Sequence, residues 1–191
     1  PAVGERIVAS PSPAAAVAVA APQPTDALYP AYLVLGSRLM KSGMDRAEGV
    51  QIYMPLLDDP AAFAVSTVAK PGESSEAASR RVDAWLSHQI DAEPTPDEIA
   101  GVGPTFGFLL GTSEIPDQAL GLNLYGVAFA MGRREQLGVA PAELKRAMEA
   151  VRAEEVHRAA VEVFEGSRRG VVVVGQMDRG RNLNPPEPSI P

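Results

Sequence analysis

The sequence contains no cysteine and only two histidines, so the means of holding a metal ion are few. Without cysteine the chain has no disulfide, no thiolate metal site and no cysteine nucleophile. Neither His88 nor His157 has a second histidine four residues away, the spacing with which one helix face grips zinc. Glu154 and Glu155 precede His157, but they add at most one further ligand on its helix face. The sequence therefore lacks a cluster able to hold a catalytic metal.

Other catalytic and binding patterns are missing as well. There is no Gly-x-Ser-x-Gly elbow, no Ser-x-x-Lys pair and no Gly-rich loop followed by the lysine of a phosphate site. The formal net charge is −7 and no basic stripe occurs, which argues against a nucleic-acid partner. We expect Arg80–Arg81 and Arg168–Arg169 to be solvated surface pairs. The longest apolar run, Ala14–Ala21, falls well short of the ~20 residues of a membrane span.

What the chain does contain suits one globular domain. Of its 191 residues 46% are hydrophobic and 21% are charged, which is enough apolar content for a sizeable core. Because only 5% of the residues are aromatic, we expect that core to consist mainly of small side chains. Residues 1–176 are interpreted as a single domain and the Pro-rich residues 177–191 as a tail or linker. Because the chain starts at Pro1 and shows no signal peptide, we expect it to be part of a longer product.

The strand signals fall at the beginning, in the first half and near the end of the chain. Ala14–Ala21 follows a shorter extended run, Glu5–Ser10. Val50–Leu57 and Ala62–Lys70 flank Asp58-Asp59-Pro60, a turn-forming sequence that predicts an antiparallel hairpin. The apolar run Val171–Val174 lies between two glycines and predicts a buried strand.

Helices are predicted between these strands. Thr25-Asp26 predicts the N-cap of a helix that ends near Lys41. A helix after Pro71-Gly72 should bury Ala78, Val82, Trp85, Leu86 and Ile90, which share one face. Thr95 to Glu98 forms a capping box. Further helices are expected over Phe106–Leu110 and Pro116–Arg134, from Pro141, and around Val156–Phe164. Strands and helices do not alternate regularly, so we predict an α+β fold, a two-layer sandwich of a mostly antiparallel sheet covered by helices.

Four segments, taken in order, resemble the pitrilysin/insulinase-type zinc peptidases, which include the mitochondrial processing peptidase. Thr25-Asp-Ala-Leu-Tyr-Pro-Ala-Tyr-Leu-Val-Leu resembles a helix of that family, and Ala61-Ala-Phe-Ala-Val-Ser-Thr-Val-Ala-Lys-Pro-Gly-Glu resembles a strand and turn. Glu93-Pro-Thr-Pro-Asp-Glu-Ile is similar to a helix start, and Gly170-Val-Val-Val-Val-Gly to the closing strand. The resemblance spans about residues 5–175.

The resemblance implies a role without catalysis. Members of the family pair homologous domains around a chamber: one carries His-x-x-Glu-His, and its partner lacks the metal and lends an Arg and a Tyr to substrate binding. This chain resembles the partner. Arg46 and Tyr53 keep the family's seven-residue interval, although Gly49 lies one position early, and Ser37–Lys41 resembles a shortened form of the preceding family helix. The candidate substrate-binding residues are therefore Arg46 and Tyr53, with no catalytic or metal residue.

These observations lead to one main hypothesis and two alternatives. The chain is interpreted as the non-catalytic partner domain of such a peptidase, inactive alone, with zinc in a homologous domain in cis or in trans and a peptide as substrate. The first alternative is a structural or assembly subunit of the same fold. The second is an unrelated small-ligand-binding α+β module. The resemblance to bacterial members implies a periplasmic or cytoplasmic location, with the periplasm slightly favoured.

Overall fold

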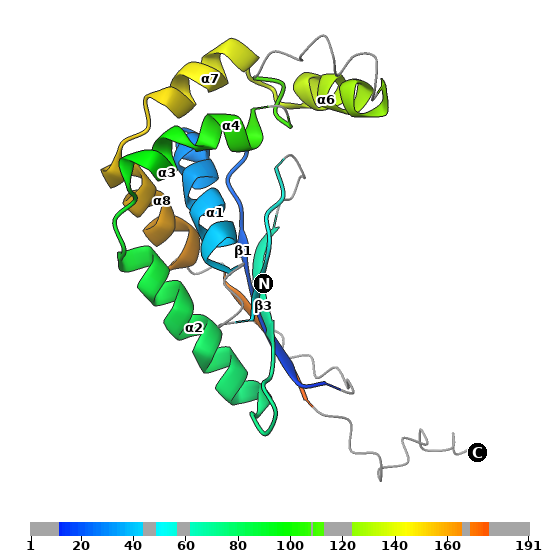
Figure 1. The fold of residues 1–191 in the computed structure, drawn as a ribbon, viewed down its shortest axis with the longest axis vertical. Helices are drawn as coiled ribbons and strands as arrows, with labels where there is room; N and C mark the ends of the chain where they lie inside the picture. Colours follow the sequence, from blue (N-terminus) through cyan, green and yellow to red (C-terminus); the bar gives the residue numbers. More distant parts are fainter. Residues whose placement is uncertain are drawn as a thin grey trace, which may run out of the picture.

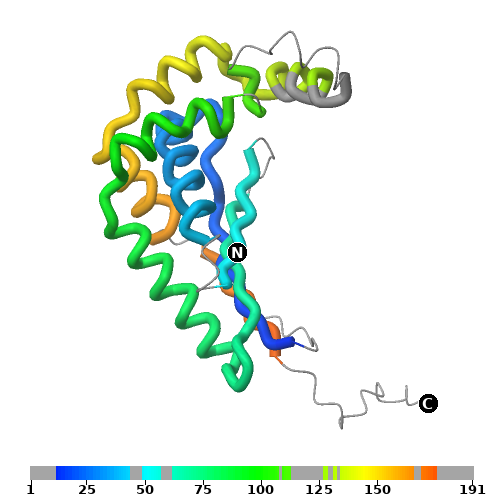
Figure 2. Tube along the Cα trace, viewed as in Figure 1, coloured from blue at the N-terminus to red at the C-terminus, as the bar shows by residue number. Residues whose placement is uncertain are grey.

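The described strands form one antiparallel sheet. The computed structural model describes residues 12–43, 49–56, 62–107, 109–112, 124–165 and 169–175. The strands are β1 (Ala14–Ala20), β2 (Val50–Tyr53), β3 (Ala62–Val68) and β4 (Gly170–Val174), in the order β2-β3-β1-β4 with every pair antiparallel. Strand β1 therefore lies between β3 and β4, and the blue, cyan and orange segments run together in Figure 2. The first and last described strands are therefore neighbours, so the sheet joins the two ends of the described chain.

Helices form a second layer on one face of the sheet. Helix α1 (Tyr29–Gly43), helix α2 (Ser75–Asp91) and helix α8 (Ala153–Phe164) lie on the same side (Figure 1). Helices α3 (Pro96–Ala100), α4 (Val102–Phe106) and α7 (Pro141–Glu149) continue this layer beyond the end of the sheet, and α6 (Leu124–Gln136) stands apart from it. The architecture is thus the predicted α+β fold, an antiparallel sheet covered by helices.

The core lies between the sheet and the helices, and aromatic rings form its centre. Tyr32 packs against Tyr29 and Phe63, and Phe63 against Phe164, with ring centroids 5.4–6.0 Å apart. The hydroxyl of Tyr29 donates to the carbonyl oxygen of Leu56 at 2.8 Å, which satisfies a buried polar group. The expectation of a core of small side chains is therefore wrong at its centre, because the few aromatic residues gather there.

The hairpin and most helices agree with the sequence-based predictions. Strands β2 and β3 pair antiparallel as expected, although the turn residues between them, and Glu5–Ser10, lie outside the described part of the chain. Helix α2 buries the predicted stripe from Ala78 to Ile90. The capping box at Thr95 and Glu98 is present in full. Alternation, periodicity and caps act locally, and here tertiary packing agrees with them.

Two helix boundaries were predicted wrongly. Helix α1 begins at Tyr29, and the carboxylate of Asp26 accepts a hydrogen bond from the backbone N–H of Gln23, before the helix, so Thr25-Asp26 forms a turn and not an N-cap. The helix expected over Phe106–Leu110 lies earlier, over Val102–Phe106. Pro104 lies inside that helix at its third position, where a missing N–H costs no intrahelical hydrogen bond.

The last strand lies at an edge and not in the interior. Strand β4 pairs with β1 alone among the described strands, and Val171 and Val172 are 39% and 44% exposed. An apolar run predicts burial only if neighbours exist on both sides, which the sequence pattern does not specify.

No helix in the described ranges is long and apolar enough to cross a membrane.

Candidate functional site

The metal-ligating residues of the described chain do not converge. Among the residues that the structure places, no three His, Asp or Glu side chains lie together in a way that could hold a metal ion. His88 is exposed on α2, and His157 lies on α8 with its Nδ1 3.3 Å from the carbonyl oxygen of Ile90. The described ranges therefore contain no candidate metal centre.

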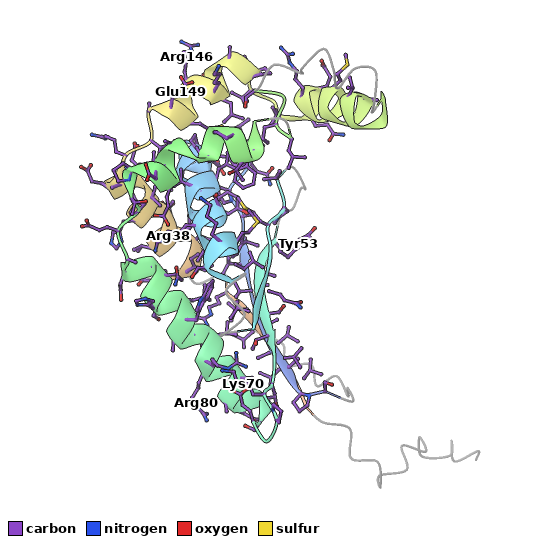
Figure 3. All side chains as sticks on the ribbon, in the orientation of Figure 1. Arg38, Tyr53, Lys70, Arg80, Arg146 and Glu149 are labelled. Atoms are coloured by element: carbon purple, nitrogen blue, oxygen red, sulfur yellow. The ribbon has the colours of Figure 1, made fainter. Side chains whose placement is uncertain are left out.

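Tyr53, one of the two predicted site residues, lies on the uncovered face of the sheet. It ends edge strand β2, opposite Ala64 of β3, and is 60% exposed. Figure 3 shows its side chain pointing away from the helices. Arg46 lies outside the described residues, so its position relative to Tyr53 stays a prediction.

The uncovered face around Tyr53 is mostly apolar and carries no charge among its described residues. The alternating burial of the strands and their register assign each side chain to a face, and Val17, Val65 and Val50 point toward the helices. We call the other side the open face, and its residues are Ala14, Ala16, Ala18, Ala20, Gln51, Tyr53, Ala62, Ala64, Ser66, Val68, Gly170, Val172 and Val174. Three of them, Tyr53, Val68 and Val172, are large apolar side chains that solvent reaches.

A polar network that the sequence did not reveal ties α2 to the end of β3. The side chain of Arg81 is only 14% exposed and donates to Glu73 (Nη2 to Oε2, 2.9 Å), to Thr67 Oγ1 (3.0 Å) and to the carbonyl oxygen of Val68 (3.1 Å). The hydrogen bond from Arg81 and that from the backbone N–H of Lys70 lower the pKa of Glu73 to about 2. The expectation of a solvated pair is thus wrong for Arg81 and right for Arg80, which is exposed.

A second buried guanidinium joins the helices. Arg38 of α1 is 6% exposed, and its Nη1 donates to the carbonyl oxygen of Ala92 at 2.6 Å, just past the end of α2. Burial lowers its pKa, and the nearby Glu98 opposes that shift. Arg38 lies in the segment that resembles a shortened family helix, and its contacts are those of a structural residue.

Two cavities open between helices, both away from the open face. The larger, of about 670 Å³, lies among α3, α4 and α7, with Ile99, Val102 and Met148 in its apolar wall and Lys145 and Glu149 beside them. The smaller, of about 470 Å³, is lined by Asp83, Asp91, Glu165 and Arg169 over apolar side chains of α2 and α8. Arg169 and Asp83 form an ion pair there, so this arginine too is held and not merely solvated.

Comparison with known proteins gives structural matches only. No protein-family model and no curated protein matches the sequence. The inactive peptidase domain of a proposed zinc protease from Bordetella parapertussis superimposes with a TM-score of 0.62 at 15% identity, over 94% of this chain and 98% of that one. A protease from Helicobacter pylori gives 0.59 at 15% identity, and the peptidase M16 inactive domain from Pseudomonas fluorescens gives 0.51 at 17%.

The matched chains differ in length. This chain covers 41% of the Helicobacter protease and 42% of the Pseudomonas protein, in each case with 86% or more of its own residues. It therefore spans less than half the length of these two proteins. The chain has the fold of M16-type peptidase domains, the pitrilysin and insulinase type that its sequence motifs resemble, and the matching structures include inactive domains of that type.

Proposed function

We propose that this chain is the non-catalytic partner domain of a pitrilysin/insulinase-type zinc peptidase and helps to enclose and bind a peptide substrate. The observation that carries the proposal is the match over 98% of an inactive peptidase domain, together with the lack of a three-ligand cluster among the placed residues. In this proposal a homologous domain, in cis or in trans, supplies the zinc, and residues 1–176 act as one domain with 177–191 as its tail. The bacterial periplasm is the compartment we favour.

Tyr53 and Arg46 are the substrate-binding residues in this proposal. A phenol and a guanidinium donate hydrogen bonds to a peptide carbonyl or to the oxyanion that forms from it. The exposure of Tyr53 on the open face supports its part, because a side chain directed into the core could not reach a substrate.

Reconstitution tests the proposal. The chain is combined with the zinc-bearing peptidase domain encoded upstream on the same gene or beside it, and hydrolysis of a fluorogenic peptide is followed. We expect Arg46→Ala and Tyr53→Phe each to lower kcat/KM about tenfold or more, since the loss of a single oxyanion donor costs at least that much. Arg80→Ala, an exposed arginine on the helical side, is the matched control. Normal turnover in both variants, with the assembly intact, would leave the chain a scaffold without substrate contacts.

The alternative of a small-ligand-binding module has one observation in its favour. The cavity among α3, α4 and α7 is apolar and has the volume of many small-molecule sites. The variant Val102→Trp places a larger side chain in this cavity. Two results together would favour this alternative: a ligand that raises the melting temperature of the wild-type chain but not of the variant, and failure of the reconstitution.

A further inference from the structure

The open face departs from the usual pattern of a solvated antiparallel sheet. Such a sheet normally alternates apolar residues toward its core with polar or charged residues toward water. Here the open face is mostly apolar, with Gln51 and Ser66 as its polar side chains besides the Tyr53 hydroxyl, and none of its thirteen residues named above is charged, although 21% of the chain is charged. Tyr53, Val68 and Val172 are 60%, 55% and 44% exposed. The pattern is that of a sheet that is covered on both sides.

In one row across the sheet, the register gives this face a low floor with a raised side. Tyr53 of β2 lies opposite Ala64 of β3, Ala64 lies opposite Ala18 of β1, and Ala18 lies opposite Gly170 of β4. Along this row the side chains therefore decrease in size, from the phenol of Tyr53 to the methyl groups of Ala64 and Ala18 and then to the hydrogen of Gly170. A second chain can bring its backbone close to this floor with its side chains against the ring of Tyr53.

Area and charge decide between possible occupants. The strands β1 and β3 have seven residues each, β2 has four and β4 has five. At about 3.4 Å per residue and about 4.8 Å between strands, the described face measures roughly 375 Å². A stable dimer buries about 800 Å² per partner, so this face is too small to hold a second copy of the chain. A charged side chain placed here would lose water and gain no partner, which disfavours a charged occupant. A short, uncharged peptide segment fits the small area of the face and places no charge on it.

We propose that the open face selects uncharged, apolar segments of a peptide substrate and rejects segments that bring a charge onto the floor around Ala18 and Ala64. This inference rests on the proposed function and adds a substrate preference to it. The preference arises from the absence of charged partners on the face, and it is distinct from the donors assigned to Arg46 and Tyr53.

A titration followed by NMR tests the inference on the chain alone. The isotope-labelled chain is titrated with an end-blocked peptide of about eight residues, long enough to cross the sheet, composed of Ala, Val, Thr and Gln. Two further peptides carry Lys or Asp at the centre. We expect the backbone amides of β1 and β3 to shift with the neutral peptide, and the two charged peptides to bind at least about tenfold more weakly.

Variants of the floor make the test specific. Ala64→Asp should weaken binding of the neutral peptide and reverse the order, so that the Lys peptide binds more tightly than the neutral one. Ala64→Ser keeps the shape without charge and should behave as wild type, which separates charge from a folding defect. Ala142→Asp places the same charge at an exposed alanine of α7 and should change nothing.

Several results would overturn the inference. They are equal affinity for the three peptides, amide shifts outside the sheet, or a dimer at micromolar concentration that Ala64→Asp dissociates. If the reconstituted peptidase works but shows no such preference, the inference fails and the proposed function stands. If the preference is present but no zinc-bearing domain forms a complex with the chain, the proposed function fails and the inference stands.

Discussion

At the scale of single residues, Arg81 shows how a charge on a helix surface becomes structural. It reaches back from α2 to the end of β3 and satisfies the hydroxyl of Thr67, which is 2% exposed, as well as the carbonyl of Val68. Glu73, in the turn that joins β3 to α2, holds the other side of the guanidinium. This network fixes the angle at which the chain leaves the sheet, and so the position of α2 on it.

We therefore predict that Arg81→Ala destabilises the fold by about 1–3 kcal/mol, because the buried hydroxyl of Thr67 loses its guanidinium donor. Urea denaturation at pH 7 measures the change. The control is Arg80→Ala, one position earlier and exposed, which should change the free energy of unfolding by less than about 0.5 kcal/mol. Equal effects of the two variants would show that the network contributes nothing.

The same network predicts how stability depends on pH. The folded state holds the pKa of Glu73 at about 2, below its ordinary 4.5. Between these two pH values the folded chain therefore binds fewer protons at this carboxyl than the unfolded chain does. Its contribution is complete above about pH 4.5 and is lost as the pH falls toward 2. The stability difference between wild type and Glu73→Gln should therefore shrink over this range, and a constant difference would contradict the assignment.

At the scale of elements, α2 is the helix whose position the sequence predicts best. Its side chains Ala78, Val82, Leu86 and Ile90 are buried, Trp85 is 7% exposed, and the Ser74 hydroxyl caps its first turn by accepting from the N–H of Ala77. The helix packs mainly on β1 and β3, so it covers the middle of the sheet. Its apolar stripe is therefore the main cover of the helical face.

We expect Trp85→Ala to destabilise the fold by about 3–5 kcal/mol, because the indole leaves a cavity that the rigid sheet cannot close. Thermal or urea unfolding followed by circular dichroism measures the loss. Ser87→Ala, at an exposed position of the same helix, controls for changes in helix propensity. A loss well under 1 kcal/mol would mean that the tryptophan contributes little to this layer.

At the scale of the whole molecule, the chain has the fold of a peptidase domain, and the residues that the structure places contain no cluster of three metal ligands. We predict that the purified chain binds no stoichiometric zinc and cleaves no peptide alone, since the two histidines have no third ligand near them in the described residues. Elemental analysis after dialysis against a chelator-free zinc buffer measures this. One tightly bound zinc per chain would refute the prediction.

The sequence alone determined the features that depend on near neighbours along the chain. The hairpin of β2 and β3, the buried stripe of α2, the capping box at Thr95 and the α+β class all followed from spacing and turn chemistry, because these act within a few residues. The family resemblance, and not short-range physics, pointed to Arg46 and Tyr53 as substrate-binding residues, and that role stays a prediction. The hairpin, the buried stripe, the capping box and the fold class are different. These are the features for which short-range physics and the final packing agree.

Only the tertiary structure decided what depends on residues far apart in the chain. The edge position of β4 follows from its pairing with β1, more than 150 residues earlier, and this pairing exposes Val172. Arg81 becomes buried because β3 ends beside it, and the scarce aromatic rings of Tyr32, Phe63 and Phe164 meet because the two layers close over them. The open face is likewise a product of register, since only the alignment of four strands brings its uncharged side chains to one side.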